Sequence, residues 1–154
     1  MTTATELIGA EELDQLRQLV EIAAGWTLTV INSEAFVFGA PKKGGGELWA
    51  RCEFDQYPTL PPIWRWCGPN GTMLDDPRII PIGGSSYFHG NGVLCAPWNR
   101  LAYSQSDGRG PHNDWTIGDW KSNPHTRECK TLAAMASRIA IEARMHFAGM
   151  KQPQ

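Results

Sequence analysis

Tyr57-Pro58-Thr59-Leu60-Pro61-Pro62 joins two segments whose residue patterns predict β-strands. Before it, Glu47 to Phe54 has the period of two expected of a half-buried strand. Leu48, Ala50, Cys52 and Phe54 share one face of this strand, and Trp49, Arg51 and Glu53 share the other. After it, Ile63 to Cys67 is a short apolar strand closed by the turn Gly68-Pro69-Asn70-Gly71. Consecutive strands with short connections of this kind are typical of an antiparallel meander.

Three further elements are predicted on the N-terminal side of these strands. Ala10 to Ala24 repeats apolar residues at three- and four-residue steps, which predicts an amphipathic helix that ends before Gly25. Two strands are predicted over Trp26 to Ile31 and Ala35 to Phe38, followed by a loop from Pro41 to Gly46. All four strands are therefore expected to form one antiparallel sheet.

The C-terminal half begins with an irregular segment and ends in a helix. Gly83 to Pro111 is rich in glycine and proline and has no apolar period. A segment of this length without regular structure is typically functional or disordered, and its aromatic residues favour an ordered, functional one. Asn123 is a good N-cap and Pro124 suits the first helical position, so a long helix is expected from there to about Ala148.

The order of these elements predicts an α+β fold, with helices packed on one face or end of an antiparallel sheet. The chain fits a single domain over residues 1–154, with an ordered core over about 10–148. The 42% of hydrophobic and 19% of charged residues indicate a globular rather than a disordered chain. The net charge is -2 and the longest basic run is Lys42-Lys43, so no nucleic-acid partner is expected. No apolar stretch approaches the about 18 residues that span a bilayer, and the N-terminus lacks a secretory pattern, so a cytoplasmic protein without a membrane partner is expected.

Four cysteines are present and none forms a Cys-x-x-Cys pair, so neither a structural zinc site nor another cofactor is expected. Cys52 alternates with core residues on a strand, Cys67 ends another strand, and Cys129 falls on the apolar stripe of the last helix. A free thiol in such a place is usually a small buried hydrophobe. Cys95 differs because it lies in the irregular segment, and loops on a rigid scaffold often carry function. Context alone leaves this cysteine open between a nucleophile and a packing thiol.

Several motifs of the chain together resemble those of ubiquitin-conjugating enzymes. The segment Tyr57-Pro58-Thr59-Leu60-Pro61-Pro62 resembles their Tyr-Pro-x-x-Pro-Pro signature, and His89-Gly90-Asn91 resembles their His-Pro-Asn motif. Gly92-Val93-Leu94-Cys95 resembles the Gly-x-Ile-Cys run that presents their active-site cysteine. The order of elements between Ala10 and Ala148 is also similar. The resemblance implies a ubiquitin-conjugating-enzyme-like (UBC-like) fold in which Cys95 is the nucleophile.

The chain departs from this family in three places. Only three residues separate Asn91 from Cys95, the segment from Ala96 to Lys121 is long and rich in tryptophan, and only one long helix follows it. Such a trimmed form resembles the divergent bacterial members encoded beside a ubiquitin-like protein, an activating enzyme and a metallopeptidase. The resemblance then implies a bacterial protein-conjugation pathway, plausibly in antiviral defence against phages.

The family resemblance implies a two-step acyl transfer through the cysteine. The thiol would accept a ubiquitin-like protein from a ubiquitin-activating-like enzyme as a thioester and pass it to an amine on a target protein. Asn91 and Asn113 are the amides that could stabilise the negative charge developing on the thioester oxygen. His112 and Asp114 are candidates for taking the proton of the amine, and His89 belongs to the matched motif. Each has a structural alternative: a turn for Asn91, a loop cap for His89, and a solvated loop for His112 and Asp114.

Two other functions remain open. The chain could be a non-catalytic UBC-like module that binds a ubiquitin-like protein, or a cysteine hydrolase with His112 or His125 as its base. His125 and Cys129 have a helical spacing that can bind a metal ion, but two further ligands are not evident. Three tryptophans are expected to hold the long segment on the sheet: Trp98, Trp115 and Trp120. In the family the first helix docks the activating enzyme, which makes candidates of Glu11, Glu12, Asp14 and Arg17.

Overall fold

The first helix, α1, is longer than the apolar pattern predicts. The computed structural model describes residues 3–72 and 80–151, and in it α1 spans Ala4–Ile22 rather than starting at Ala10. Thr3 and Glu6 form a capping box: Oγ1 of Thr3 accepts from the N–H of Glu6 at 3.1 Å, and Oε2 of Glu6 accepts from the N–H of Thr3 at 2.7 Å. The apolar stripe begins after this cap, which is why periodicity alone misses the first turns.

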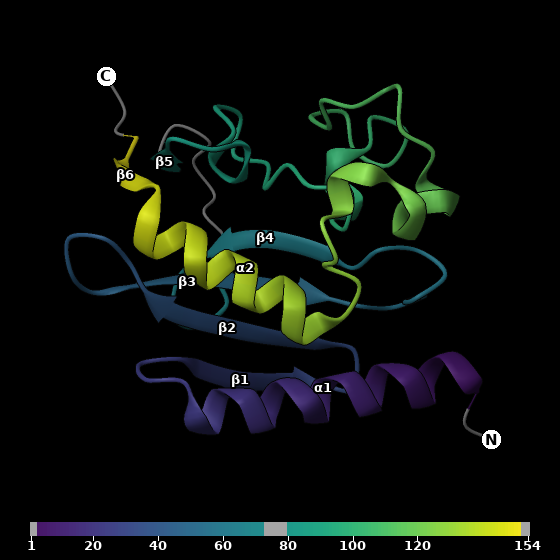
Figure 1. The fold of residues 1–154 in the computed structure, drawn as a ribbon, viewed down its shortest axis with the longest axis horizontal. Coiled ribbons are helices and arrows are strands. Elements are labelled where there is room, and N and C mark those ends of the chain that lie inside the picture. The colour runs from purple at the N-terminus through teal and green to yellow at the C-terminus, as the bar shows by residue number, and fades with distance from the viewer. Residues whose placement is uncertain (1–2, 73–79, 152–154) are drawn as a thin grey trace.

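The four-stranded antiparallel meander is confirmed (Figure 1). Its strands lie in chain order: β1 (Thr27–Asn32), β2 (Ala35–Pro41), β3 (Glu47–Glu53) and β4 (Ile63–Cys67). β2 extends beyond its predicted end at Phe38 because it pairs with β3 along its whole length. β4 is the last strand in this order, so the polar backbone groups on its outer edge need partners from elsewhere in the chain.

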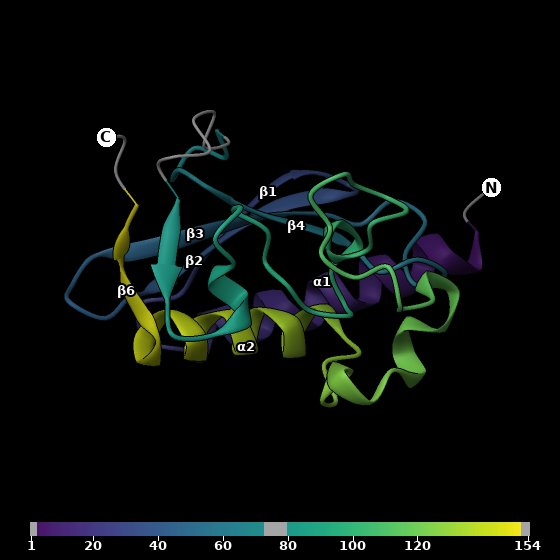
Figure 2. The same cartoon turned by 90° about the horizontal axis from the view of Figure 1, so that it is seen from above.

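The main core lies between the sheet and two helices. The second helix, α2 (Leu132–Met145), crosses one face of the sheet, and α1 runs beside β1 on the same side (Figures 1 and 2). The largest buried side chains come from both layers, and each is 2% exposed or less: Leu16, Phe36, Phe38, Trp64, Met135 and Ile139. The α+β class and this two-layer packing agree with the sequence prediction.

The prediction of one long helix from Asn123 is wrong in its first turns. Asn123 caps only a single 3-10 turn, η4 (Pro124–Thr126). Arg127 and Glu128 then adopt left-handed conformations with φ of 52° and 66°, which end the helical path. α2 begins after a second N-cap, Thr131, whose hydroxyl accepts a backbone hydrogen bond from the first turn at 3.1 Å.

The chain after α2 forms a strand that the sequence does not predict. β6 (Phe147–Met150) pairs antiparallel with β5 (Pro81–Gly83) in a separate two-stranded sheet. Gly83 permits this pairing because a Cβ at that position would collide with the carbonyl oxygen of His146. Gly149, expected just beyond the end of a helix, instead lies within β6.

The irregular segment and the residues that follow it up to α2, together residues 84–131 and called the long segment below, contain several short 3-10 turns. Besides η4 these are η1 (Ser86–Phe88), η2 (Arg100–Ala102) and η3 (Ile117–Ser122). Figure 1 shows most of the segment gathered above one end of the sheet. Residues 84–111 contain no long helix or strand, as their composition predicts.

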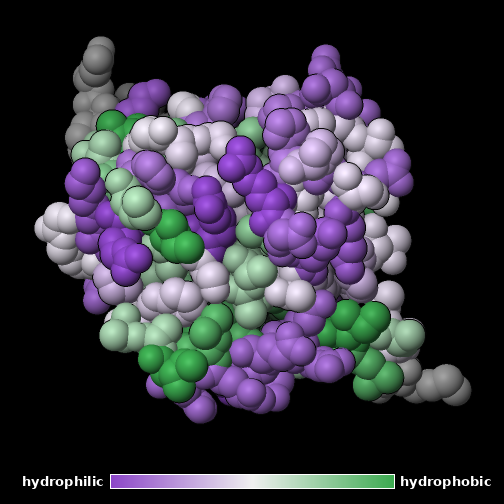
Figure 3. All heavy atoms as spheres, viewed as in Figure 1, coloured by the Kyte–Doolittle hydropathy of each residue, from purple (hydrophilic) through white to green (hydrophobic). Residues whose placement is uncertain are grey.

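The molecular surface differs between the long segment and α1. Figure 3 shows mainly polar side chains over the long segment and apolar patches along the edge where α1 runs. The exposed apolar residues of α1 are Leu7, Ile8 and Ile22, which are 60%, 38% and 83% exposed. Within residues 3–72 and 80–151, no helix has the length and apolar character needed to cross a membrane.

Candidate functional site

Asn99 fixes the segment that carries Cys95 against the edge of the sheet. Its side-chain oxygen accepts from the N–H of Trp64 at 3.0 Å, and its amide nitrogen donates to the carbonyl of Trp64 at 3.1 Å. The same nitrogen donates to the carbonyl of Leu94 at 2.7 Å. The Asn99 amide thus pairs with the outer edge of β4 as a neighbouring strand would. The N–H of Cys95 is held in turn by the carbonyl of Ser86 at 3.1 Å.

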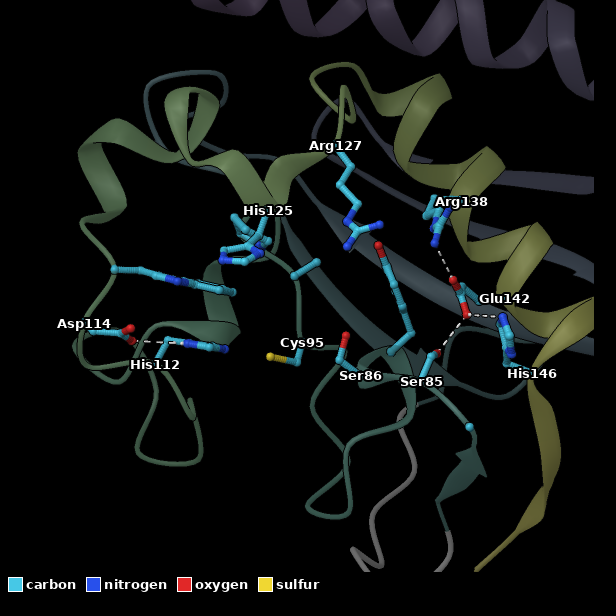
Figure 4. Close-up of a pocket in the computed structure, with 15 residues that line it drawn as sticks. Ser85, Ser86, Cys95, His112, Asp114, His125, Arg127, Arg138, Glu142 and His146 are labelled. Atoms are coloured by element: carbon cyan, nitrogen blue, oxygen red, sulfur yellow. Dashed lines mark hydrogen bonds and ion pairs between the residues drawn. The ribbon is translucent and has the colours of Figure 1, made fainter.

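Cys95 lines a cavity of about 520 Å³ between the long segment and α2. Figure 4 shows the cysteine between two groups of side chains, one from the long segment and one from α2 and the residues around β5. None of the other three cysteines lines this cavity. Cys95 is therefore the one cysteine of the four that lines the cavity.

The first wall of the cavity combines imidazole, carboxylate and indole groups. Nδ1 of His112 lies 3.2 Å from Oδ1 of Asp114, and the His112 ring stacks on Trp115 with centroids 3.4 Å apart. The ring of His125 stacks on Trp115 with a centroid distance of 6.1 Å. In Figure 4 the Cys95 side chain points toward this wall. Folding therefore brings His112 and Asp114 into the lining of the same cavity as Cys95.

The opposite wall is centred on Glu142, whose carboxylate is almost completely buried. Oε1 lies 2.9 Å from Nη2 of Arg138, and Oε2 accepts from the hydroxyl of Ser85 at 2.8 Å. Nε2 of His146 lies 3.8 Å from the same Oε2. These partners compensate a carboxylate that would otherwise be costly to bury, so Glu142 ties α2 to the chain next to β5.

The Cys95 thiol is less accessible than its loop position suggests. The residue is 7% exposed, and this burial raises the pKa of the thiol to about 11. The backbone around it is irregular, as expected, but the long segment folds over it. The thiol is therefore largely protonated at neutral pH.

The other three cysteines are buried, which confirms their predicted packing role. Burial also raises the pKa of Cys52 and Cys67. The predicted place of Cys129 on the apolar stripe of the last helix is wrong, because it precedes Leu132, the first residue of α2. His125 and Cys129 consequently do not share a helix, which removes the geometric basis for a metal-binding pair. Among the described residues, no group of three or more His, Cys, Asp or Glu side chains is placed to hold a metal ion.

His89 and Asn91 lie in a turn beside the cysteine segment rather than on the cavity lining. Oδ1 of Asn91 lies 2.8 Å from Nδ1 of His89 and accepts from the N–H of Val93 at 3.0 Å. Its amide nitrogen donates to the carbonyl of Arg109 at 2.7 Å. Asn91 therefore joins two loops of the long segment, and its amide nitrogen donates to a backbone carbonyl outside the cavity lining. The other amide candidate, Asn113, is exposed.

Two of the three tryptophans pack as expected. The ring of Trp98 is buried with its centroid 6.2 Å from that of Trp64 in β4. Trp120 is also buried and donates from Nε1 to the carbonyl of Pro58 at 3.1 Å. Trp115 differs, because it is only half-buried and stacks with histidines in the cavity wall. Trp98 and Trp120 therefore anchor the long segment, and Trp115 helps to build the site.

Glu12 is not a free docking residue. Its carboxylate is buried and accepts from the hydroxyl of Tyr57 at 2.5 Å and from the N–H of Leu132 at 2.9 Å. It therefore joins α1, the proline-rich connection and the start of α2. The prediction that places Glu12 on a docking surface is wrong, whereas three other candidates are exposed: Glu11, Asp14 and Arg17.

Several site residues escape the sequence analysis, among them Asn99, Arg127 and Glu142. Asn99 is a polar residue within the apolar run from Val93 to Ala102, which is the one local signal of a buried hydrogen-bonding role. Glu142 lies next to the predicted apolar stripe of the last helix, so its burial could be suspected but its partners could not. Arg127 has no local signal, because its place in the cavity depends on the break between η4 and α2.

The resemblance to ubiquitin-conjugating enzymes rests on short motifs and on the order of elements. Of the motif residues, only Cys95 lines the cavity; His89 and Asn91 lie in the neighbouring turn, and Tyr57 is bonded to Glu12 outside it. Comparison of the chain with protein-family models gives no match, and comparison with curated proteins gives no significant match.

Proposed function

We propose that the chain is a ubiquitin-conjugating-like acyltransferase that carries a ubiquitin-like protein as a thioester on Cys95. The observation that carries this proposal is the cavity in which Cys95, and no other cysteine, lies with His112 and Asp114. The chain order of helix, four-stranded meander and later helix, together with the family-like motifs, supports it. The proposed partners are a ubiquitin-like protein, a ubiquitin-activating-like enzyme and a target protein. The proposed setting is the bacterial cytoplasm, in conjugation that serves antiviral defence.

The proposed reaction has two acyl transfers. In the first, the Cys95 sulfur attacks the carbonyl carbon of the thioester on the activating enzyme; a new C–S bond forms and the enzyme's thiolate leaves. In the second, an amine nitrogen attacks the Cys95 thioester, the C–S bond breaks, and the electron pair returns to the Cys95 sulfur. The amine gives up its proton to a base, and an amide bond results.

A base is needed because the Cys95 thiol, with a pKa of about 11, is mostly protonated at neutral pH. Nδ1 of His112 faces the Asp114 carboxylate at 3.2 Å, which leaves Nε2 to accept a proton. The carboxylate orients the ring and stabilises its protonated form, as in other nucleophile–base–acid arrangements. In the proposal, His112 acts as base in both transfers and Asp114 positions it. Asn91 and His89 hold the neighbouring loops, and that is their proposed role.

Each alternative function has one observation in its favour. A non-catalytic module that binds a ubiquitin-like protein is favoured by the buried, protonated thiol of Cys95. A cysteine hydrolase is favoured by the His112–Asp114 pair in the same cavity as the cysteine. The three functions differ in the fate of the acyl group. The conjugating enzyme forms a stable thioester, the binding module forms no covalent adduct, and the hydrolase releases the acyl group to water.

The test is a charging reaction with the cognate activating enzyme, ATP and the ubiquitin-like protein, analysed on gels with and without reductant. We expect an adduct that reductant removes, that is absent from Cys95→Ala, and that becomes a reductant-resistant ester in Cys95→Ser. Cys129→Ser, which alters a thiol outside the cavity, should still form the adduct. A bound but uncharged ubiquitin-like protein would indicate the binding module. Released product without an adduct would indicate the hydrolase.

A further inference from the structure

Arg127 supplies the cavity beside Cys95 with a positive charge that no neighbouring acid neutralises. Figure 4 shows its guanidinium extending into the cavity from the loop between η4 and α2. The other arginine of the cavity, Arg138, is paired with Glu142 at 2.9 Å. Among the described residues, Arg127 has no ion pair and no side-chain hydrogen bond.

The backbone conformation at Arg127 is energetically unfavourable. Arg127 and Glu128 are two successive non-glycine residues with left-handed φ angles, a conformation that the surrounding structure must enforce. The enforcing contacts lie on both sides of the pair. Thr126 is buried and donates from its hydroxyl to the carbonyl of Trp120 at 2.6 Å, and Cys129 is buried as well. The loop is thus fixed at both ends, and the exposed Arg127 side chain is among those that line the cavity.

The cavity is lined by as many carboxylates as arginines, but neither carboxylate is paired with Arg127. Glu142 is held by an arginine and a serine hydroxyl, and the exposed Asp114 faces the His112 ring at 3.2 Å. Two further imidazoles line the cavity, His125 and His146. An unpaired guanidinium among imidazoles favours a carboxylate, because its planar fork matches the two carboxylate oxygens.

We propose that the cavity contains a carboxylate-binding subsite, in which Arg127 binds an anionic group of the molecule that reacts with Cys95. If the proposed acyl transfer is right, this group is an acidic side chain of the incoming protein. It belongs either to the C-terminal tail of the ubiquitin-like protein or to the sequence around the acceptor amine. The identity of the carrier rests on the proposed function, whereas the subsite itself does not.

Alkylation of Cys95 tests the subsite without any partner protein. Iodoacetate and iodoacetamide both react by attack of the thiolate on the methylene carbon; a C–S bond forms and iodide leaves with the bonding electrons. The reagents differ in that the first carries a carboxylate and the second a neutral amide. The ratio of their rates at Cys95, measured on the Cys95 peptide by mass spectrometry, therefore reports anion preference. A change in thiol ionisation affects both rates alike and cancels from the ratio.

We expect Arg127→Gln to lower the iodoacetate-to-iodoacetamide ratio by about two- to fivefold, the effect of an ion pair at a solvent-accessible site. Arg127→Lys should retain part of the preference, because it keeps the charge but not the fork. Arg144→Gln is the matched control, because Arg144 lines a different pocket beside Trp26 and should leave the ratio unchanged. Salt at 0.5 M should lower the ratio of the unmodified protein toward that of Arg127→Gln. Equal ratios in Arg127→Gln and the unmodified protein would overturn the subsite.

Single-turnover assays with the conjugation partners then identify the carrier of the carboxylate. Slower charging of Arg127→Gln, with normal discharge, assigns it to the tail of the ubiquitin-like protein. Normal charging with slower discharge assigns it to the acceptor. If Cys95 is never charged, the proposed acyl transfer fails while the alkylation ratio still decides whether the anion subsite exists. The two proposals therefore fail separately.

Discussion

Replacing Asn99 by alanine removes four hydrogen bonds from a completely buried site. The amide oxygen accepts from the N–H groups of Trp64 and Leu101 at 3.0 and 3.2 Å. The amide nitrogen donates to the carbonyls of Trp64 and Leu94 at 3.1 and 2.7 Å. At about 1 kcal/mol of net stability for each bond, the free energy of unfolding should fall by about 4 kcal/mol. Such a loss is a large share of the about 5–15 kcal/mol that stabilises a typical domain.

Urea unfolding followed by tryptophan fluorescence measures this loss, with the urea dependence of the free energy expected to stay unchanged. Asn91→Ala is the control: Asn91 is only half-buried, so water replaces its lost partners and a loss below about 1.5 kcal/mol is expected. Asn99→Ala should also raise the rate at which iodoacetamide alkylates Cys95, since Leu94 loses its anchor. A loss below about 1 kcal/mol for Asn99→Ala would refute the conclusion that this amide completes the edge of β4.

Two further predictions follow from buried groups. Tyr57→Phe removes the hydroxyl that donates to Glu12, so the free energy of unfolding in urea should fall by about 1–2 kcal/mol; unchanged stability would contradict the structural role of Glu12. Burial raises the pKa of Cys95 to about 11. The thiolate fraction, and with it the rate of alkylation of Cys95, should therefore rise about tenfold per pH unit from pH 7 to about 10. A rate that levels off near pH 9 would instead indicate a thiol that ionises as it does in an unfolded chain.

Local patterns were sufficient to predict the meander. The alternation of Leu48, Ala50 and Cys52 specifies one face of β3, and the short run from Ile63 to Cys67 gives β4 its correct bounds. Such periodicity is a property of neighbouring residues, so it can be recognised without knowledge of the tertiary structure. The same holds for the burial of Cys52, which lies on the apolar face of its strand.

The errors arise where distant residues determine the local structure. Asn123 and Pro124 are a sound helix start, but the chain leaves the helical path at Arg127, and Thr131 with Glu12 caps α2 instead. β6 forms only because Gly83 lets another part of the chain approach. Neither event leaves a signal in the residues directly around it.

The candidate site was predicted in part. The thiol, the imidazole and the carboxylate of Cys95, His112 and Asp114 meet in one cavity, as the motif resemblance and the residue types suggested. The opposite wall around Glu142 comes from α2 and the residues next to β5, which are far apart in the sequence. Side-chain pairs of this kind depend on packing, so sequence patterns alone could not place them.

The small sheet of β5 and β6 has a practical consequence for handling the protein. β5 leads into η1, where Ser86 accepts the N–H of Cys95, and the N–H of Lys151 donates to the carbonyl of Ile80 at 2.7 Å. A mechanical force on a tag or surface linker attached after β6 would therefore act on this sheet and, through η1, on the segment that contains Cys95. The first turn of α1 lies at the opposite side of the molecule from β6 (Figure 1). Affinity handles, fluorophores and immobilisation chemistry are best attached there.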